Sequence, residues 1–204
     1  MRAPKPEDKM NRVYRIVESP IGPLTLVGIL DGDAKDSGTG RRAQAVLQSI
    51  WFSSSKQDRT LRPNAKPYPA PSDANLDESS LEDAARQLDE YFRGTRREFD
   101  LPLEPIGTEF QRRVWDELSR IPYGIAISYR DLALRIGKPD AVRAVGSANG
   151  RNPLPIVIPC HRVIASDGTL AGFGGGIPAK QFLLGLEGVD IPSSLNQLAM
   201  LSDR

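Results

Sequence analysis

Residues 128–150 read SYRDLALRIGKPDAVRAVGSANG, and this stretch decides how the second half of the chain is interpreted. Ser128 followed by Asp131 resembles a capping box, which marks the start of a helix, and Gly137 ends that helix. Pro139 suits the first position of a second helix, which runs to the end of the stretch. Two short helices joined by a glycine-containing turn predict a helix-turn-helix, and an ordinary helical hairpin is the alternative.

The second of these helices is unusually rich in small side chains. They are Ala141, Ala144, Gly146, Ser147 and Ala148. Small side chains let a helix approach another surface closely, and that surface is either another helix or a groove of nucleic acid. Arg143 is the one long charged side chain among them.

Upstream of the helix-turn-helix the chain changes character near residue 105. Apolar segments over 13–18 and 23–30 flank a turn and predict a β-hairpin, and residues 45–52 favour a third strand over a short helix. Ser80 is expected to cap a helix that Gly94 ends. Downstream of the change, Thr108 is expected to cap one helix and residues 180–186 to form another.

These elements predict a two-domain α/β protein. A small N-terminal α/β domain with a short antiparallel sheet is expected over 12–104, and a mainly α domain over 105–190. Residues 1–11 are expected to be a disordered extension and residues 191–204 a tail. A long exposed loop is expected over 53–79, where Pro, Ser, Asn and Asp are frequent.

Composition excludes several classes of protein. No apolar run approaches the ~18 residues of a membrane span, and the polar start lacks a secretion signal, so a cytoplasmic location is expected. One cysteine and one histidine cannot supply four Cys or His ligands to zinc. The net charge is +1, but residues 71–104 hold ten acids and four arginines, whereas residues 112–164 hold nine bases and four acids. The basic half could face phosphate, or the two halves could simply have unevenly charged surfaces.

The only cysteine and the only histidine are adjacent, in the segment Ile158-Pro159-Cys160-His161-Arg162-Val163-Ile164. A thiol becomes a good nucleophile when a nearby base or cation stabilises the thiolate, and His161 is the one histidine that could do so. Neighbouring side chains of an extended segment point to opposite faces, so their contact would require a turn or a bridging water. The histidine would also need an orienting acceptor. These residues alone leave open whether Cys160 is reactive or an inert buried thiol.

The Cys160 segment resembles the active-site signature of the O6-alkylguanine-DNA alkyltransferases (methylated-DNA–protein-cysteine methyltransferases). The resemblance covers residues 107–188 in order and spacing. It includes Ser128-Tyr129, Arg143 to Gly146, Asn152-Pro153, Gly174 to Gly176 and Leu183 to Gly188. Residues 19–24 also resemble the family's first domain, whereas residues 31–79 show little resemblance. The family implies a ribonuclease-H-like N-terminal domain and a winged helix-turn-helix-like C-terminal domain.

The resemblance implies DNA repair by direct reversal. Cys160 would accept an alkyl group from O6 of guanine, or O4 of thymine, once per molecule and without a cofactor. His161 would take the thiol proton through a water, and Glu187 would hold the imidazole in the right tautomer. Tyr129 would donate its hydroxyl to the guanine ring, and Asn152 would fix the turn before the active-site segment.

The implied partner is double-stranded DNA that contains O6-alkylguanine, bound through its minor groove by a monomer, with no role for a membrane. A base inside a duplex cannot reach a buried thiol, so the base must flip out, and Arg143 would fill the gap. The carbonyl oxygens of Cys160 and Val163 would accept hydrogen bonds from the guanine amino group. Phosphate contacts would come from Arg130, Arg151 and Ser166.

Three positions depart from many relatives. Phe173 stands where many carry Tyr, Gly174 where some carry Ser, and Asn149 where some carry an apolar residue. These changes predict altered hydrogen bonding to the lesion and an altered tolerance of bulky adducts. Two other functions are alternatives: a lesion-binding protein without transfer activity, in which the cysteine is commonly replaced by Trp, and a transcriptional regulator that uses the helix-turn-helix.

Overall fold

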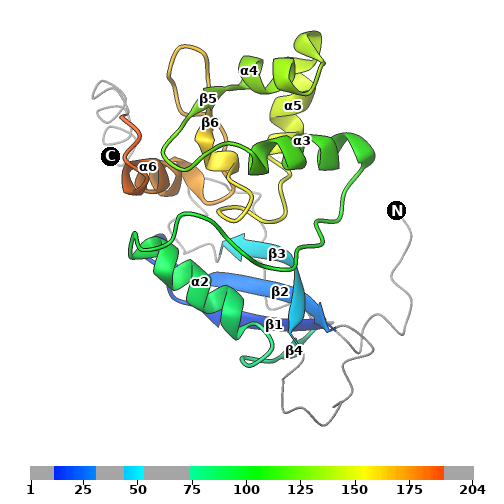
Figure 1. Cartoon of the computed structure of the whole chain (residues 1–204), viewed down its shortest axis with the longest axis vertical. Coiled ribbons are helices and arrows are strands. Elements are labelled where there is room, and N and C mark those ends of the chain that lie inside the picture. Colours follow the sequence, from blue (N-terminus) through cyan, green and yellow to red (C-terminus); the bar gives the residue numbers. More distant parts are fainter. Residues whose placement is uncertain (1–11, 31–43, 53–73, 191–204) are drawn as a thin grey trace. The chain divides into compact units, whose positions relative to one another are not determined.

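The computed structural model describes residues 12–30, 44–52 and 74–190 (Figure 1). The chain divides into two compact units between Pro105 and Ile106. The predicted extension over 1–11 and the predicted tail over 191–204 lie outside the described residues, as does most of the predicted loop over 53–79.

The first unit contains a sheet with the strand order β3-β2-β1-β4. Strands β1 (Arg12–Val17) and β2 (Leu24–Leu30) form the predicted antiparallel hairpin, and β3 (Ala45–Phe52) adds antiparallel to β2 as the predicted third strand. Strand β4 (Asn75–Leu76) pairs with β1 in parallel. The sheet is therefore mixed, not antiparallel throughout, and the loop predicted over 53–79 contains a short strand.

Helix α2 (Glu82–Phe92) covers one face of this sheet with Ala84, Leu88 and Tyr91 buried (Figure 1). The prediction that Ser80 caps it is wrong. Leu81 occupies the N-cap position without a side-chain hydrogen bond, while the Ser80 side chain is buried. The turn before the helix is instead held by a carboxylate that the sequence reading overlooked: Oδ1 of Asp77 accepts hydrogen bonds from the backbone N–H groups of Ser79 and Ser80.

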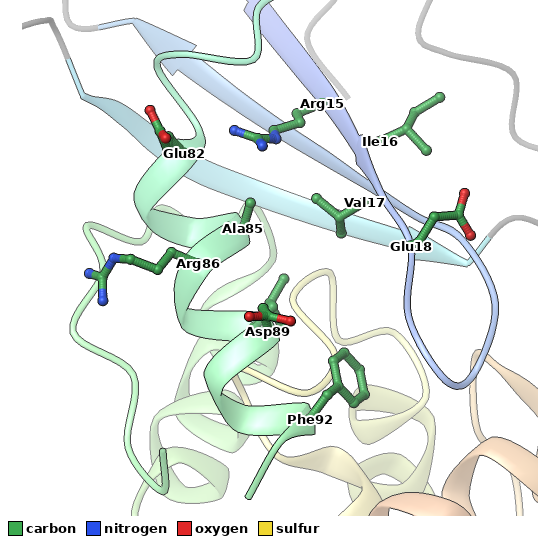
Figure 2. A pocket seen from close by; sticks show the side chains of 10 residues that line it. Arg15, Ile16, Val17, Glu18, Glu82, Ala85, Arg86, Asp89 and Phe92 are labelled. Atoms are coloured by element: carbon green, nitrogen blue, oxygen red, sulfur yellow. The ribbon is translucent and has the colours of Figure 1, made fainter. Parts of the chain in front are cut away.

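A pocket of about 470 Å³ lies between β1 and α2 in this unit (Figure 2). Its walls mix acidic, basic and apolar side chains, among them Arg15, Glu18, Glu82, Asp89 and Phe92. None of the residues predicted for alkyl transfer or DNA binding lines this pocket. Those residues all lie in the second unit.

The second unit is mainly helical. Its elements are α3 (Glu109–Ser119), β5 (Ile127–Ser128), α4 (Tyr129–Arg135), the 3-10 turn η2 (Pro139–Ala141), α5 (Val142–Asn149), the 3-10 turn η3 (Cys160–Arg162), β6 (Val163–Ile164) and α6 (Gly176–Leu186). The predicted capping box at Ser128 is confirmed: Asp131 and Ser128 exchange hydrogen bonds. Thr108 caps α3 as predicted and forms a second capping box with Gln111. Helix α6 begins at Gly176, four residues before the predicted start.

The core of the second unit lies between α3, α4 and α5. Val114, Trp115 and Val145 are fully buried there, and the indole N–H of Trp115 donates to the carbonyl oxygen of Ala148 at 2.9 Å. This bond ties the first helix of the unit to the C-terminal end of α5. No helix among the described residues is long and apolar enough to cross a membrane.

Two short strands connect the helix-turn-helix to the cysteine segment. Strand β5 lies immediately before α4, and strand β6 lies immediately after the Cys160 turn. They pair in parallel, with Ile127 opposite Val163 and Ser128 opposite Ile164. This pairing brings the start of α4, where Tyr129 lies, next to the segment that carries Cys160.

Candidate active site

The loop before Cys160 is held from within by Asn152. Its side-chain carbonyl accepts from the backbone N–H of Leu154 at 3.0 Å, and its amide donates to the carbonyl oxygen of Ile158 at 2.7 Å. The loop is buried, and Ile156 adopts a left-handed backbone angle of 78°, which is rare for a β-branched residue. Asn152 therefore fixes a constrained loop, at the place where the family resemblance assigned it.

Cys160 and His161 lie in a 3-10 turn rather than in an extended segment, and both are buried. Nε2 of His161 lies 2.9 Å from Oε1 of Glu187, a residue 26 positions further along the chain. Glu187 is the C-cap residue of α6, so the end of that helix carries the carboxylate to the imidazole. The structure thus brings together the two side chains that the resemblance paired.

Glu187 receives hydrogen bonds from more than the histidine. Nε of Arg162 donates to its Oε2 at 2.7 Å, Nη2 of Arg162 donates to its Oε1 at 2.9 Å, and the backbone N–H of Gly124 donates to its Oε2 at 3.1 Å. Burial alone would raise the pKa of Glu187, but hydrogen bonds from His161 and Arg162, with their charges, hold that pKa well below its usual range. The carboxylate is therefore ionised at neutral pH.

Burial works against charge on the reactive pair. It raises the pKa of the Cys160 thiol, against the hydrogen bond from the Asn152 side chain and the charge of Lys180, which both lower it. Burial also lowers the pKa of His161, although the hydrogen bond and charge of Glu187 raise it. The resting pair is a neutral thiol beside a neutral imidazole, and a proton has to leave the sulfur before it can attack.

Lys180 is a functional candidate that the sequence reading missed. Its side chain is buried, and Nζ donates to the carbonyl oxygens of Val163 at 2.6 Å and Ala171 at 3.0 Å. Burial lowers the pKa of this amine to about 8, and the negative charge that Cys160 carries as a thiolate opposes the shift. The available signal was a single cation within an otherwise uncharged helix, which is a weak sign because lysine stems commonly lie along apolar surfaces.

Tyr129 occupies the first position of α4 and is half-buried. Its hydroxyl donates to the carbonyl oxygen of Ala171 at 3.2 Å, and its ring lies 6.0 Å from Nζ of Lys180. Burial raises the pKa of the phenol, as does the negative charge of Cys160 in its thiolate form, so the hydroxyl stays protonated and able to donate. The carbonyl of Val163, assigned to the guanine amino group, here accepts from Lys180.

The residues predicted to contact DNA are on the surface. Arg143 is exposed on α5 beside Ala144 and Ser147, while Val145 and Ala148 of the same helix are buried. The side chains predicted to meet phosphate are exposed as well: Arg130, Arg151 and Ser166. Helix α5 therefore presents a face of small side chains around one arginine.

Two of the departures from the family lie against the reactive pair. Phe173 is buried and packs edge-on to the His161 ring, with ring centroids 6.3 Å apart and planes at 78°. Asn149 is buried at the end of α5, where its amide lies 3.5 Å from the carbonyl oxygen of Cys160. Gly174 is exposed. Among the described residues, no group of three or more His, Cys, Asp or Glu side chains could hold a metal ion.

Comparison with known proteins gives the same assignment to both units. Residues 109–189 match the family described as 6-O-methylguanine DNA methyltransferase, DNA binding domain, and residues 52–105 match its ribonuclease-like domain. The second match corrects the expectation of little resemblance over 31–79, because it begins at residue 52.

Full-length relatives extend the match over most of the chain. A methylated-DNA–protein-cysteine methyltransferase of Methanosarcina barkeri is 44% identical over 85% of this chain and 96% of its own length. One from Mycolicibacterium paratuberculosis is 43% identical over 89% and 96%. The chain in the crystal structure of Mycobacterium tuberculosis OGT in complex with DNA is 40% identical, with a TM-score of 0.68 over 86% of this chain and 92% of that one. With a lone cysteine beside a histidine and carboxylate pair, and with this similarity over both units, the chain belongs to the methylated-DNA–protein-cysteine methyltransferase family.

Proposed function

We propose that this protein repairs DNA by moving an alkyl group, methyl in the first instance, from O6 of guanine to Sγ of Cys160. The observation that carries the proposal is the buried pair of Cys160 and His161, with His161 held by the ionised Glu187. The thioether that forms is chemically stable, so each molecule acts once. O4 of alkylated thymine presents the same reacting atoms and is a second substrate.

The reaction is a direct displacement at the alkyl carbon. His161 removes the thiol proton from Cys160 through a water molecule, and Glu187 stabilises the imidazolium that forms. The sulfur then bonds to the alkyl carbon as the bond from that carbon to O6 breaks, and its electron pair stays on the guanine. The Tyr129 hydroxyl donates to the guanine ring and stabilises this charge. One proton returns to the guanine, matching the one that His161 took from the thiol, so the imidazole ends neutral.

The exposed face of α5 is proposed to bind the minor groove. Its small side chains allow close approach, and readout there is nearly independent of sequence, as repair of a lesion at any site requires. Arg143 takes the place of the flipped base, and Arg130, Arg151 and Ser166 contact phosphates. We assign this work to a domain over 105–190 that acts as a monomer in the cytoplasm.

A mass measurement tests the proposal directly. The protein is incubated with duplex DNA containing O6-methylguanine or O6-benzylguanine, and the peptide containing Cys160 is weighed. One added methyl group is expected on that peptide from the O6-methylguanine duplex, and one benzyl group is the corresponding product from the O6-benzylguanine duplex. Neither is expected in Cys160→Ala, which serves as the matched control. Folded protein that binds the lesion DNA but gains no alkyl group would identify a lesion-binding protein instead.

A further inference from the structure

We propose that Arg162 is a positioning residue for alkyl transfer. It holds both carboxylate oxygens of Glu187 and thereby keeps the His161 ring neutral. In that ring Nε2 carries the proton, and Nδ1 is the nitrogen that acts as the base. This inference deepens the proposed function and rests on it. It concerns a side chain that does not touch the reacting atoms and acts only through Glu187.

The geometry of Arg162 is that of a clamp. Its guanidinium makes a bidentate contact with Glu187, at 2.7 Å to one carboxylate oxygen and 2.9 Å to the other. The remaining terminal nitrogen, Nη1, donates to the carbonyl oxygen of Ile121 at 2.6 Å, and the Tyr123 ring lies 5.7 Å from the guanidinium carbon. The planar guanidinium is held in place by these contacts, so its bidentate hydrogen bonds fix the orientation of the Glu187 carboxylate.

That orientation decides which nitrogen of His161 carries the proton. Oε1 of Glu187 accepts from Nε2 of the ring, so the ring nitrogen on the other side is the one that can take a proton. A carboxylate that could rotate would hold the imidazole less firmly. Through Arg162, the turn after α3 is thus connected to the tautomer of the catalytic base.

Charge gives Arg162 a second effect. A buried carboxylate beside an imidazole favours imidazolium, and imidazolium cannot accept the thiol proton. Among the described residues, the charges that act on His161 are those of Glu187 and Lys180, from the end and the middle of α6, and of Arg162, from its own turn, which also holds the titratable Cys160. Burial is the largest cause of the lowered pKa of His161, and the charges of Arg162 and Lys180 lower it further while Glu187 raises it. Arg162 therefore offsets the charge of Glu187 at the ring.

A single histidine makes the protonation state directly measurable. With ¹⁵N-labelled histidine, NMR of the full-length protein reports only His161. The expected wild-type spectrum is a neutral ring protonated at Nε2. Arg162→Gln removes the offsetting charge, so the imidazole pKa is expected to rise and the methyl-transfer rate at neutral pH to fall by about 10²-fold, the scale of a lost general base. Arg162→Lys keeps the positive charge but cannot make the bidentate contact. Its imidazole pKa and its methyl-transfer rate should lie between those of the wild type and of Arg162→Gln.

Two comparisons separate positioning from a merely structural ion pair. Arg96→Gln removes a similar contact in the first unit, where Nε of Arg96 lies 2.7 Å from Oε2 of Glu90, and it should leave the His161 signals and the rate unchanged. In a Glu187→Gln background, Arg162→Lys should cost little further rate, because its route to His161 is already broken. Independent, multiplying losses there would overturn the proposal.

The test does not depend on Arg162→Gln alone. If Arg162→Gln does not fold, Arg162→Lys carries the test. A folded Arg162→Lys protein with the wild-type imidazole tautomer, pKa and rate would overturn the positioning role. The NMR measurement needs no DNA, so a protein that shows the expected spectra but gains no methyl group on Cys160 would refute the proposed function and leave the role of Arg162 in holding His161 standing.

Discussion

Replacing Lys180 by Met should stabilise the protein slightly and slow its reaction. Lys180 is fully buried, and its pKa falls from 10.5 to about 8. At 1.36 kcal/mol per pKa unit, this shift means that the ammonium ion costs the folded state about 3 kcal/mol at neutral pH. Met fills much of the same volume without a charge. Two carbonyl oxygens, of Val163 and Ala171, lose a donor at about 1 kcal/mol each, so a net gain of about 1 kcal/mol is expected.

The pH dependence of stability gives this prediction its sign. The folded-state pKa of Lys180 lies below the unfolded value, so between pH 8 and 10.5 the folded protein binds fewer protons than the unfolded chain. The free energy of unfolding therefore rises with pH across that window. Lys180→Met lacks this rise. Urea titrations at several pH values, in a Cys160→Ala background so that the thiol does not titrate, measure the difference. Lys138→Met, at an exposed lysine, is the control, and its free energy of unfolding should depend on pH as that of the parent protein does.

The rate should move in the opposite direction. The charge of Lys180 lowers the pKa of the Cys160 thiol, so its loss makes the thiolate harder to form. We expect methyl transfer at neutral pH to slow about tenfold, which corresponds to about 1.4 kcal/mol of lost thiolate stabilisation. Two outcomes would refute these claims. A Lys180→Met protein destabilised by several kcal/mol at pH 7 would show that the buried ammonium does not cost the folded state energy, and one that transfers methyl at the wild-type rate would show that the ammonium does not assist the thiolate.

Four further substitutions test separate parts of the structure. Glu187→Gln should lose about 3–5 kcal/mol of stability at pH 7, because it leaves a buried guanidinium unpaired. Since the pKa of Glu187 in the folded state is depressed from 4.5, the wild-type advantage should begin to decline as pH falls below about 4.5 and disappear only as pH passes through the much lower folded-state pKa, as acid titrations would show. Gly107→Ala puts a Cβ 2.4 Å from the Trp115 ring and should lower the free energy of unfolding by about 1–3 kcal/mol. Gly185→Ala meets open space on α6 and should raise the free energy of unfolding by about 0.5–1 kcal/mol, and thermal melts measure both. Ser128→Ala removes the cap of α4 and should cost about 1 kcal/mol in urea.

Local signals in the sequence were sufficient for most of the elements. The capping box at Ser128 needs only four consecutive residues, and the hairpin of β1 and β2 needs only a turn between two apolar runs. Ser80 shows where such signals fail. A serine before an apolar helix is a common cap, but here Asp77, three residues earlier, binds the backbone N–H of Ser80, and the N-cap position falls on Leu81. Two competing local caps cannot be ranked without the turn they form.

Long-range contacts were predictable only where a family pattern supplied them. The pairing of His161 with Glu187 spans 26 positions and came from the resemblance, not from any local pattern. Arg162 and Lys180 were not assigned roles because each is a common surface residue type. Their burial follows from two facts of the tertiary structure, namely that the end of α6 packs on the Cys160 turn and that the loop around Ala171 covers the Lys180 amine.

The buried charges of the second unit favour an ionised sulfur. Among its described residues, two buried side chains are cationic, Arg162 and Lys180, and one is anionic, Glu187, while His161 rests neutral. This leaves one positive charge without a buried anion to balance it, and a Cys160 thiolate is that anion. Burial holds the thiol protonated until His161 accepts its proton, so the site combines a charge distribution suited to the thiolate with a barrier to forming it. Lys180, with a pKa of about 8, supplies the balancing charge only below that pH. The stabilisation of the thiolate by the site should therefore weaken in alkaline solution, even as the thiol itself becomes easier to ionise.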